Sequence, residues 1–213
     1  MKELCTKFEK LPEEKKKKII DACIKEFSKN GYVNASTNNI VLNACISKGS
    51  LFSYFDNKKK LYLYVVDYAI NFYVNLILKK MKINNPDILN RILEGAELKI
   101  SIAMEAPIAY QFFATVFINI PEELKADIEI RYNKLYAEGY RLSVEDIDYT
   151  LFRDDIDKQK AIELIIMSLN GISEKYISLY KSIEDNGYEQ IHQAYDQLKE
   201  YVSILRKVYY KNA

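Results

Sequence analysis

The sequence predicts an all-α protein, and three observations support this fold class. Apolar residues recur at three- and four-residue intervals along most of the chain. Prolines precede several of these periodic segments, as they do at helix starts. No stretch between turn signals alternates apolar and polar residues as a half-buried strand does. With 213 residues, of which 49% are hydrophobic, the chain is long enough for one large or two small domains with a real core.

The first long helix is predicted to begin at Pro12 and to end near Asn30, after a charged N-terminal arm that we expect to fray. Proline suits the first turn of a helix, and Glu13 and Glu14 are favourable near its positive end. Its buried face consists of apolar side chains at helical spacing: Ile19, Ile20, Cys23, Ile24 and Phe27. Gly31 is expected to end the helix in a left-handed backbone conformation.

Residues 36–61 contain two short helical patterns separated by a four-residue break. Ser36 or Thr37 can cap the first helix and Ser47 the second, because a hydroxyl there accepts a bond from an unpaired backbone N–H. The inward positions of the two helices are apolar: Ile40, Val41, Ala44, Leu51 and Phe55. Ile46 fills the angle between the helices. The pattern is typical of a helix-turn-helix, whose second helix enters the major groove of DNA.

The outward face of the second helix and of the residues after it carries Lys48, Gly49, Ser50, Phe52, Tyr54 and Lys58. Gly49 has no side chain, so the helix can approach a sugar-phosphate strand closely. Lys48 can donate to guanine O6 and N7, and Ser50 can serve either type of base. The Tyr54 hydroxyl and the Lys58 ammonium suit phosphate oxygens, which set the register of a complex without reading its sequence.

The spacing of these residues resembles the DNA-binding domain of the tetracycline-repressor (TetR) family of transcriptional regulators. The resemblance covers roughly residues 15–62 and rests on Gly31, Tyr32, Ser36, Thr37, Ile40, Ala44, the run from Ser47 to Phe52, Tyr54, Phe55, Lys58 and Leu61. It implies that DNA is contacted by Thr37, Asn38, Lys48, Ser50, Phe52, Tyr54 and Lys58. We therefore expect a three-helix DNA-binding domain at 1–56 and a helical ligand-binding and dimerisation domain at 57–213.

Three positions depart from the family pattern. Val41 replaces a usual alanine, Cys45 a usual glycine, and Phe52 a usual tyrosine. The position of Cys45 favours a left-handed backbone, which costs a non-glycine residue on the order of 1–2 kcal/mol. Phe52 keeps the ring but loses a hydroxyl that binds phosphate. The alternative is that residues 36–61 are merely two core-packing helices, but capping, inward spacing and outward chemistry agree on DNA binding.

Charge is distributed unevenly along the chain, although the net charge is only +1. Residues 1–60 carry 13 lysines against 7 acidic residues, a net charge of +6. The remaining 18 basic and 23 acidic residues give −5. The positive charge therefore accompanies the helix-turn-helix, where phosphates would be met, and the acidic remainder should point away from DNA.

Neither a metal site nor an enzyme is predicted. Cys5, Cys23 and Cys45 are odd in number and widely spaced, and no signal peptide precedes them, which indicates a reducing cytoplasm. A zinc site is not expected, because the chain has no Cys-x-x-Cys and one histidine. Glu189 and His192 have the spacing of a di-iron ligand pair, but such a site needs two pairs. No cofactor is expected.

A long apolar helix is predicted over residues 57–82, and its length permits a membrane span. Asp67, Asn71 and Asn75 recur every four residues along one face. A charged residue in the middle of a span costs roughly 2.5–3.5 kcal/mol on insertion scales. We therefore interpret the segment as a buried connecting helix with one polar seam, and expect no membrane partner.

Further helices are predicted near 86–105, 107–119 and 121–145, each beginning at a proline. Aromatic and soft side chains crowd this region, and they could line a cavity for an apolar or aromatic ligand. The candidate ligand-binding residues are Phe72, Met104, Tyr110, Phe113, Phe117, Tyr132 and Tyr136. For any single residue, ordinary packing in the core or on the surface is the alternative; the expectation of a pocket rests mainly on the family resemblance.

The last two helices, near 158–184 and 188–210, have the most regular apolar spacing in the chain. An Asn186–Gly187 turn joins them into an antiparallel hairpin, and two hairpins related by a two-fold axis would form a four-helix bundle. The predicted dimer interface consists of Ile162, Ile165, Leu169, Ile172, Tyr176, Tyr195, Leu198, Val202 and Leu205. The alternative is that both seams pack on the chain's own middle helices.

Together these features predict a homodimeric, ligand-responsive transcriptional repressor. It would bind a palindromic double-stranded DNA operator and be released by an apolar or aromatic small molecule. The alternative is a helical dimeric protein that binds small molecules or partners and has no DNA role. That alternative leaves the outward Lys48, Ser50 and Tyr54 unexplained.

Overall fold

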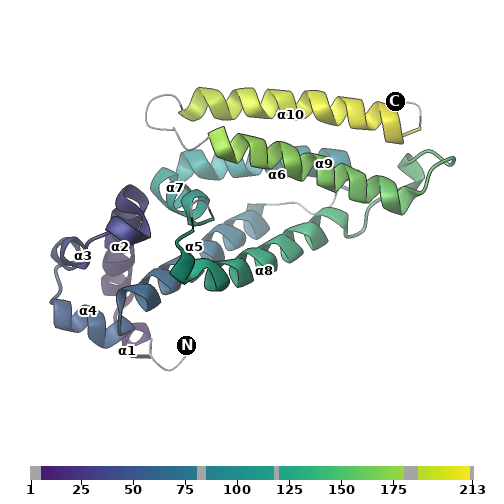
Figure 1. Ribbon diagram of the computed structural model, residues 1–213. Coiled ribbons are helices and arrows are strands. Elements are labelled where there is room, and N and C mark those ends of the chain that lie inside the picture. Colours follow the sequence, from purple (N-terminus) through teal and green to yellow (C-terminus); the bar gives the residue numbers. More distant parts are fainter. Residues whose placement is uncertain (1–5, 81–84, 118–119, 180–186, 212–213) are drawn as a thin grey trace. The chain divides into compact units, whose positions relative to one another are not determined.

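The computed structural model describes residues 6–80, 85–117, 120–179 and 187–211, and its regular structure there is helical (Figure 1). The predicted all-α fold class is confirmed. Within these ranges the β-type pairing is an isolated bridge between Phe152 and Tyr210. The elements in chain order are α1 (Thr6–Glu9), α2 (Glu13–Asn34), α3 (Thr37–Ala44), α4 (Lys48–Phe55), α5 (Lys58–Lys80), α6 (Ile88–Glu105), α7 (Pro107–Val116), η1 (Glu122–Leu124), α8 (Lys125–Val144), η2 (Tyr149–Leu151), α9 (Lys158–Leu179) and α10 (Gly187–Tyr209).

Prolines mark helix starts as the sequence predicts, with local adjustments. Pro107 is the first residue of α7. Pro121 precedes the short 3₁₀ turn η1, which leads directly into α8. After Pro86, α6 begins two residues late because Asp87 caps it, accepting bonds from the backbone N–H groups of Leu89 at 2.9 Å and Asn90 at 3.2 Å. The predicted helix ends at 82, 119 and 184 lie outside the described residues.

The break predicted at Gly31 is present, but helical hydrogen bonding continues beyond it to Asn34. Gly31 has φ 65° and ψ 178°, a positive-φ conformation open almost only to glycine. The N–H of Ala35 then bonds back to the carbonyl of Gly31 at 3.2 Å. Gly31 therefore kinks α2 where the sequence predicted that the helix would end.

The N-terminal arm differs from the prediction, because part of it folds. Helix α1 buries Phe8, whose ring lies 4.8 Å from that of Phe55 and 5.3 Å from that of Tyr64. Glu9 accepts a hydrogen bond from the Tyr64 hydroxyl. The expectation of a frayed arm was wrong for these residues, because a single aromatic among charges gives no periodic signal.

Packing divides the chain into two compact units, each interrupted in sequence. Unit 1 comprises residues 1–76 and 102–136. Its core joins α2 to α5 with side chains of α7, η1 and α8: Phe112, Val116, Leu124 and Ile128 are buried in the same cluster as Phe27 and Leu61. The two units are defined by packing contacts and not by function. The boundary between a DNA-binding domain at 1–56 and a ligand-binding domain at 57–213 therefore stays a prediction.

Helix α5 is long and apolar enough to cross a membrane, the one such helix among the described residues. Its apolar side chains nevertheless lie in the core of unit 1, where Leu61, Val65 and Val66 are fully covered. The predicted polar seam also exists. Asp67, in that seam, is bridged by the Arg131 guanidinium of α8 through two hydrogen bonds of 2.7 Å. These contacts are those of a core helix.

Unit 2 comprises residues 77–101 and 137–213, and α9 and α10 lie side by side within it (Figure 1). Its core consists of Ile88, Leu89, Ile147, Phe152, Ala161, Ile162, Ile165, Ile166, Leu169, Val202 and Tyr210. A polar cluster lies beside it. The Asp87 carboxylate accepts from the Arg206 guanidinium and from the Tyr210 hydroxyl, each at 2.7 Å. Burial raises the pKa of Tyr210, and the adjacent Asp87 raises it further.

Candidate DNA-binding and effector sites

The helix-turn-helix is built by two serine caps and a shared core. Ser36 Oγ accepts from the N–H of Asn39 at 3.4 Å, and Ser47 Oγ accepts from the N–H of Ser50 at 3.0 Å. Both are the caps that the sequence predicts. Four of the five predicted inward residues are buried, and Val41 packs against the same cluster: Ile40, Ala44, Leu51 and Phe55. The caps and the core together fix the angle at which α4 leaves α3.

Cys45 occupies the left-handed position that the sequence predicts. Its φ of 54° and ψ of 47° place it at the C-cap of α3, and its side chain is exposed. The N–H groups of Cys45 and Ile46 bond to the carbonyls of Leu42 and Val41 at 3.2 Å and 3.0 Å. The turn therefore closes as in a glycine-capped helix, with a strained residue in place of glycine.

Replacing Cys45 with glycine is expected to raise the free energy of unfolding by about 0.5–1 kcal/mol. Relief of left-handed strain is worth about 1–2 kcal/mol, and the extra freedom of glycine in the unfolded chain offsets part of it. Thermal unfolding followed by circular dichroism measures the change. Cys45→Ala is the control, because alanine keeps the strain; an equal gain in both variants would contradict the assignment.

The predicted base-reading residues lie on the open side of α4. Lys48 and Gly49 are exposed, and Ser50 is half-buried with its hydroxyl 2.9 Å from that of Ser47. A Cβ placed on Gly49 would meet only Ser47 Oγ at 3.9 Å, so the fold itself does not require glycine there. The space at Gly49 is therefore compatible with the close approach to DNA that the sequence predicts. On α3, Asn38 is exposed and Thr37 is half-buried.

The other predicted contacts are partly engaged within the chain. Phe52 and Tyr54 are half-buried, and the Tyr54 ring packs edge-on against Phe8 at 5.9 Å. Lys58 Nζ donates to the carbonyl of Val33 at 3.0 Å and lies 5.2 Å from the centre of a tyrosine ring, that of Tyr32. The Lys58 ammonium is therefore engaged within the chain in this structure.

A buried carboxylate positions the start of α3, and the sequence analysis missed it. Glu26 of α2 is 7% exposed and accepts from the Ser36 N–H at 2.8 Å. It also accepts from the side-chain amides of Asn30 at 2.9 Å and Asn39 at 3.4 Å. Four donated bonds compensate for its burial. Asn30 is one turn from Glu26 on α2, but Ser36 and Asn39 reach Glu26 only after α2 and α3 pack, so spacing in the sequence gave no signal for them.

Five of the seven candidate ligand residues form one series of neighbouring rings in unit 1: Tyr110, Phe113, Phe117, Tyr132 and Tyr136. Tyr73 connects them, since its ring lies 4.3 Å from that of Phe113 and 5.9 Å from that of Tyr110. Phe117 is 5.8 Å from Phe113 and 5.6 Å from Tyr132, whose ring stacks on Tyr136 at 6.2 Å. We call these six residues the aromatic ladder.

The ladder runs from a buried hydroxyl to the surface. Tyr73 is 4% exposed, and its hydroxyl has no hydrogen-bond partner among the described residues. Burial raises the pKa of both Tyr73 and Tyr110. Tyr132 and Tyr136, at the other end, are exposed. An apolar series that contains an unpaired buried hydroxyl suits an aromatic or aliphatic molecule carrying a hydrogen-bonding group.

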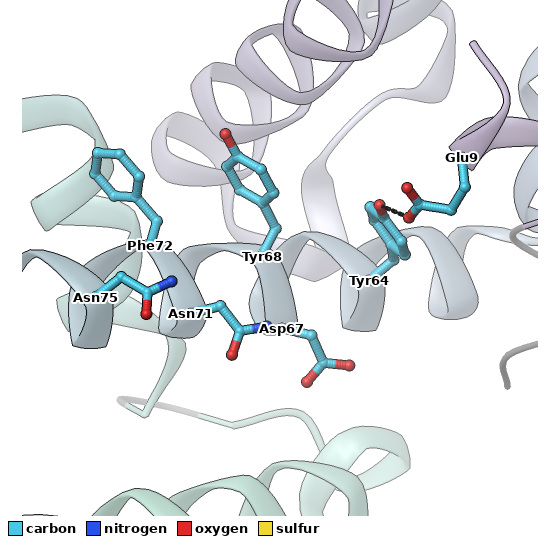
Figure 2. Close-up of a pocket in the computed structure, with 7 residues that line it drawn as sticks. All are labelled: Glu9, Tyr64, Asp67, Tyr68, Asn71, Phe72 and Asn75. Atoms are coloured by element: carbon cyan, nitrogen blue, oxygen red, sulfur yellow. Dashed lines mark hydrogen bonds between the residues drawn. The ribbon is translucent and has the colours of Figure 1, made fainter. Parts of the chain in front are cut away.

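Phe72 and Met104 lie outside the ladder, and both are exposed. Phe72 stacks on Tyr68 at 6.5 Å and lines an open groove of about 370 Å³ along α5 (Figure 2). The two carboxylates of that groove are already paired, Glu9 with the Tyr64 hydroxyl and Asp67 with Arg131. Phe72 and Tyr73 are adjacent, so their side chains diverge around the helix, and only Tyr73 reaches the ladder.

The structure covers most of the predicted dimer interface within a single chain. Ile162, Ile165, Leu169 and Val202 are buried in the core of unit 2, and Ile172, Leu198 and Leu205 pack against it. Tyr195 is half-buried and donates to Glu97 of α6, and the side chain of Tyr176 lies outside the described residues. The buried residues face the chain's own helices, which is the alternative that the sequence left open.

A different apolar stripe faces outward on the same two helices. Its members are exposed large side chains, which we call the outer stripe: Leu164 and Met167 on α9, and Tyr201, Ile204 and Val208 on α10. They alternate around each helix with the buried residues, and helical spacing alone does not tell which of two adjacent apolar faces is covered. His192 is exposed, and the described residues contain no cluster of metal-ligating side chains.

Comparison with known proteins agrees with this architecture. The family described as "Bacterial regulatory proteins, tetR family" matches residues 19–65, which span α2 to the start of α5. The biofilm operon icaADBC HTH-type negative transcriptional regulator IcaR of Staphylococcus epidermidis is 30% identical over 124 residues, 58% of this chain and 52% of that protein. The chain thus matches about half the length of this curated relative.

Solved structures share the fold over nearly the whole chain. A TetR family transcriptional regulator from Chloroflexus aurantiacus is 20% identical and matches 97% of this chain and 98% of its own, with a TM-score of 0.60. The regulator FadR of Bacillus subtilis, solved in complex with stearoyl-CoA, is 17% identical and matches 88% and 97%, with a TM-score of 0.61. The helix-turn-helix match, the curated relative and the shared fold agree: residues 19–65 of this chain match the tetR family of bacterial regulatory proteins, and the chain as a whole shares the fold of solved TetR regulators.

Proposed function

We propose that this protein is a cytoplasmic, homodimeric transcriptional repressor that binds a palindromic DNA operator and is released by an apolar or aromatic small molecule. The exposed N-terminal half of α4 carries this proposal, because Lys48 and Gly49 lie open on a helix held by caps and a core. The relative from Staphylococcus epidermidis, a negative transcriptional regulator, supports repression over activation.

The outer stripe supports a dimer. Exposed large apolar side chains on these two helices are unfavourable in water, and a second copy presents the same side chains around a two-fold axis. Two α4 helices related in this way would read half-sites about 34–36 Å apart, one turn of DNA, or a multiple of that distance. Dimerisation through the outer stripe replaces the interface that the sequence predicted.

The aromatic ladder supports an apolar or aromatic effector. It lies in the same unit as the helix-turn-helix, and α5 links the two, since Lys58 begins that helix and Tyr73 sits further along it. The complex of FadR with stearoyl-CoA shows that a relative of this fold accommodates an apolar chain. An effector lowers DNA affinity only by its preference for the conformation that does not bind DNA.

Selection of binding sites from random duplex DNA with the purified protein tests the function directly. The expected result is a palindromic motif with half-sites separated by one helical turn or a multiple of it. Recovery of no enriched motif would favour the alternative, a helical dimeric binding protein without a DNA role. The recovered duplex then serves in release assays with candidate effectors.

Two substitutions distinguish a contact to the DNA backbone, which positions the protein, from a contact to a base, which reads the sequence. Replacing Lys48 with alanine should cost about 1–3 kcal/mol on the selected duplex and relax preference at one base pair. Replacing Lys58 with alanine should weaken binding to every sequence and reduce the slope of log affinity against log salt by about one unit. Fluorescence anisotropy across a salt series measures both effects.

Lys79→Ala is the matched control for charge. Lys79 lies on the same helix as Lys58, about 30 Å away at 1.5 Å per residue, well beyond the screening length of about 10 Å. Lys79→Ala should therefore leave unchanged both the affinity for the duplex and the slope of log affinity against log salt. If Lys48→Ala and Lys58→Ala bound the selected duplex as the parent does, the assigned contacts would be incorrect.

A further inference from the structure

Helix α1 lies before residues 19–65, the part of the chain that matches the family, and its single aromatic side chain is buried. This side chain, Phe8, is 1% exposed. Its ring lies 5.9 Å from that of Tyr54 and 4.8 Å from that of Phe55, the last two residues of α4. It also lies 5.3 Å from the ring of Tyr64 on α5. Rings from three helices therefore form one cluster, which we call the ring cluster.

The contacts of α1 connect the end of α4 to the rest of unit 1. Among the described helices, α4 packs most extensively on α1 and on α3. Phe8 meets its three neighbouring rings at interplanar angles between 50° and 77°, the edge-to-face arrangement that aromatic pairs favour. Glu9 accepts a hydrogen bond from the Tyr64 hydroxyl and pairs with Lys16 of α2 at 3.7 Å. Helix α1 is thus tied to α2 and α5 while its ring packs on the end of α4.

The short length of α4 makes it dependent on this support. Its eight residues bury two side chains, Leu51 and Phe55. An isolated helix shorter than about 12–15 residues is marginal in water, so tertiary contacts decide its position. Removal of the Phe8 ring opens a cavity beside Phe55, and the C-terminal end of α4 then gains room to move while Leu51 stays fixed.

We propose that Phe8 is a positioning residue for DNA binding: by packing on the C-terminal end of α4, it sets the angle at which Lys48 and Gly49 meet a base pair. The inference rests on the proposed function, in which α4 reads DNA, and adds to it a residue that is too deeply buried to touch DNA itself. Lys48 lies six to seven residues before the ring cluster, about 10 Å at 1.5 Å per residue. A tilt of about 10° at the cluster moves that end by about 2 Å, whereas a binding group must be held within roughly 0.5 Å.

The test compares Phe8→Ala with Phe112→Ala, its matched control. Phe112 is also 1% exposed in the core of unit 1, but its ring packs on Phe27 of α2 and Tyr62 of α5. The probes are two fluorescently labelled duplexes, the one recovered by selection and one of the same length and mixed sequence. Fluorescence anisotropy, well below the melting temperature, gives the affinity of each variant for each duplex.

Phe8→Ala should lose about ten- to hundredfold in affinity for the selected duplex and stay within about threefold of the parent on the mixed duplex. The two losses differ because base contacts need the angle of α4, whereas non-specific binding depends on the charge of the phosphates. Phe112→Ala should melt at a lower temperature than the parent but keep the parent's ratio of the two affinities.

The smaller change to leucine keeps the test decisive if circular dichroism shows that the alanine variants do not fold. Relative to Phe112→Leu, Phe8→Leu should lower the ratio of selected to mixed affinity by about three- to tenfold, because leucine fills the space but makes no ring contacts. Equal ratios in the two variants of a pair would overturn the inference, since Phe8 would then contribute to stability alone. A parent protein that binds both duplexes equally would instead contradict the proposed function.

Discussion

Met167→Glu is expected to convert the proposed dimer into folded monomers, whereas Leu169→Glu, two residues away, should unfold unit 2. Met167 is 67% exposed in the outer stripe, so a carboxylate there stays in water in the monomer and is buried only when two copies meet. Leu169 is 5% exposed among apolar neighbours, where an unpaired carboxylate costs more than about 4 kcal/mol. Sedimentation velocity measures the mass of each variant, and circular dichroism measures its fold.

Ser203→Glu is the control for the added charge. Ser203 is exposed on α10, on a different side of the helix from Ile204 and Val208. The Ser203→Glu variant should keep both the mass in solution and the melting temperature near those of the parent protein. A Met167→Glu protein that remains dimeric would show that the outer stripe is not the interface. A folded, monomeric Leu169→Glu would instead favour the interface predicted from the sequence.

Arg91→Met should lower the free energy of unfolding by about 3–5 kcal/mol, the largest stability effect we expect from a single polar residue. The guanidinium is 2% exposed and donates to backbone carbonyls of three residues: Asn85, Leu142 and Glu145. Two of these lie at the C-terminal end of α8, where helix carbonyls lack partners of their own. Methionine fills similar space but leaves them unpaired. Chemical denaturation gives the difference.

Arg141→Met provides the comparison. Arg141 also lies on α8 and also makes several hydrogen bonds, to the carboxylates of Glu138 and Glu145, but all of these groups face solvent. Exposed ion pairs contribute little because water competes for both charges. We expect no measurable loss of stability. Similar losses in the two variants would mean that the carbonyl contacts of Arg91 do not set its contribution.

Local features of the fold could be predicted from the sequence, because local rules determine them. A hydroxyl before a helix caps it, so the sequence predicts a cap at Ser36 or Thr37 and another at Ser47. The left-handed turn at Cys45 followed from the family resemblance, in which a glycine usually occupies this position. The helix starts near prolines could be predicted from the sequence in the same way. The frayed arm was mistaken because the burial of Phe8 depends on two rings that lie far away in sequence.

The candidate DNA-binding and dimerisation sites were also predictable only where neighbouring residues in the sequence determine the structure. Lys48 and Gly49 are exposed as the periodicity of α4 predicts, whereas Tyr54, also predicted to face outward, packs against Phe8. Several residues predicted for the interface are instead covered within the chain, because α9 has two adjacent apolar faces, and only packing against Ile88, Leu89 and Phe152 shows that Leu169 belongs to the inner one. Glu26 was missed because two of its partners, Ser36 and Asn39, come from the start of the next helix. The sequence gives the charge of a residue, but it does not give the side chains that surround that residue after folding.

The interrupted composition of unit 1 has a consequence during protein synthesis. Residues 1–76 leave the ribosome before residues 102–136, which supply Phe112, Leu124 and Ile128 to their common core. At 5–20 residues per second, synthesis of the chain from residue 76 to residue 136 takes roughly 3–12 s. During that time the apolar side chains of residues 1–76 that pack against residues 102–136 stay open to solvent. Chaperone capture during that interval, and aggregation of fragments that stop after α5, follow from the order in which the chain is made.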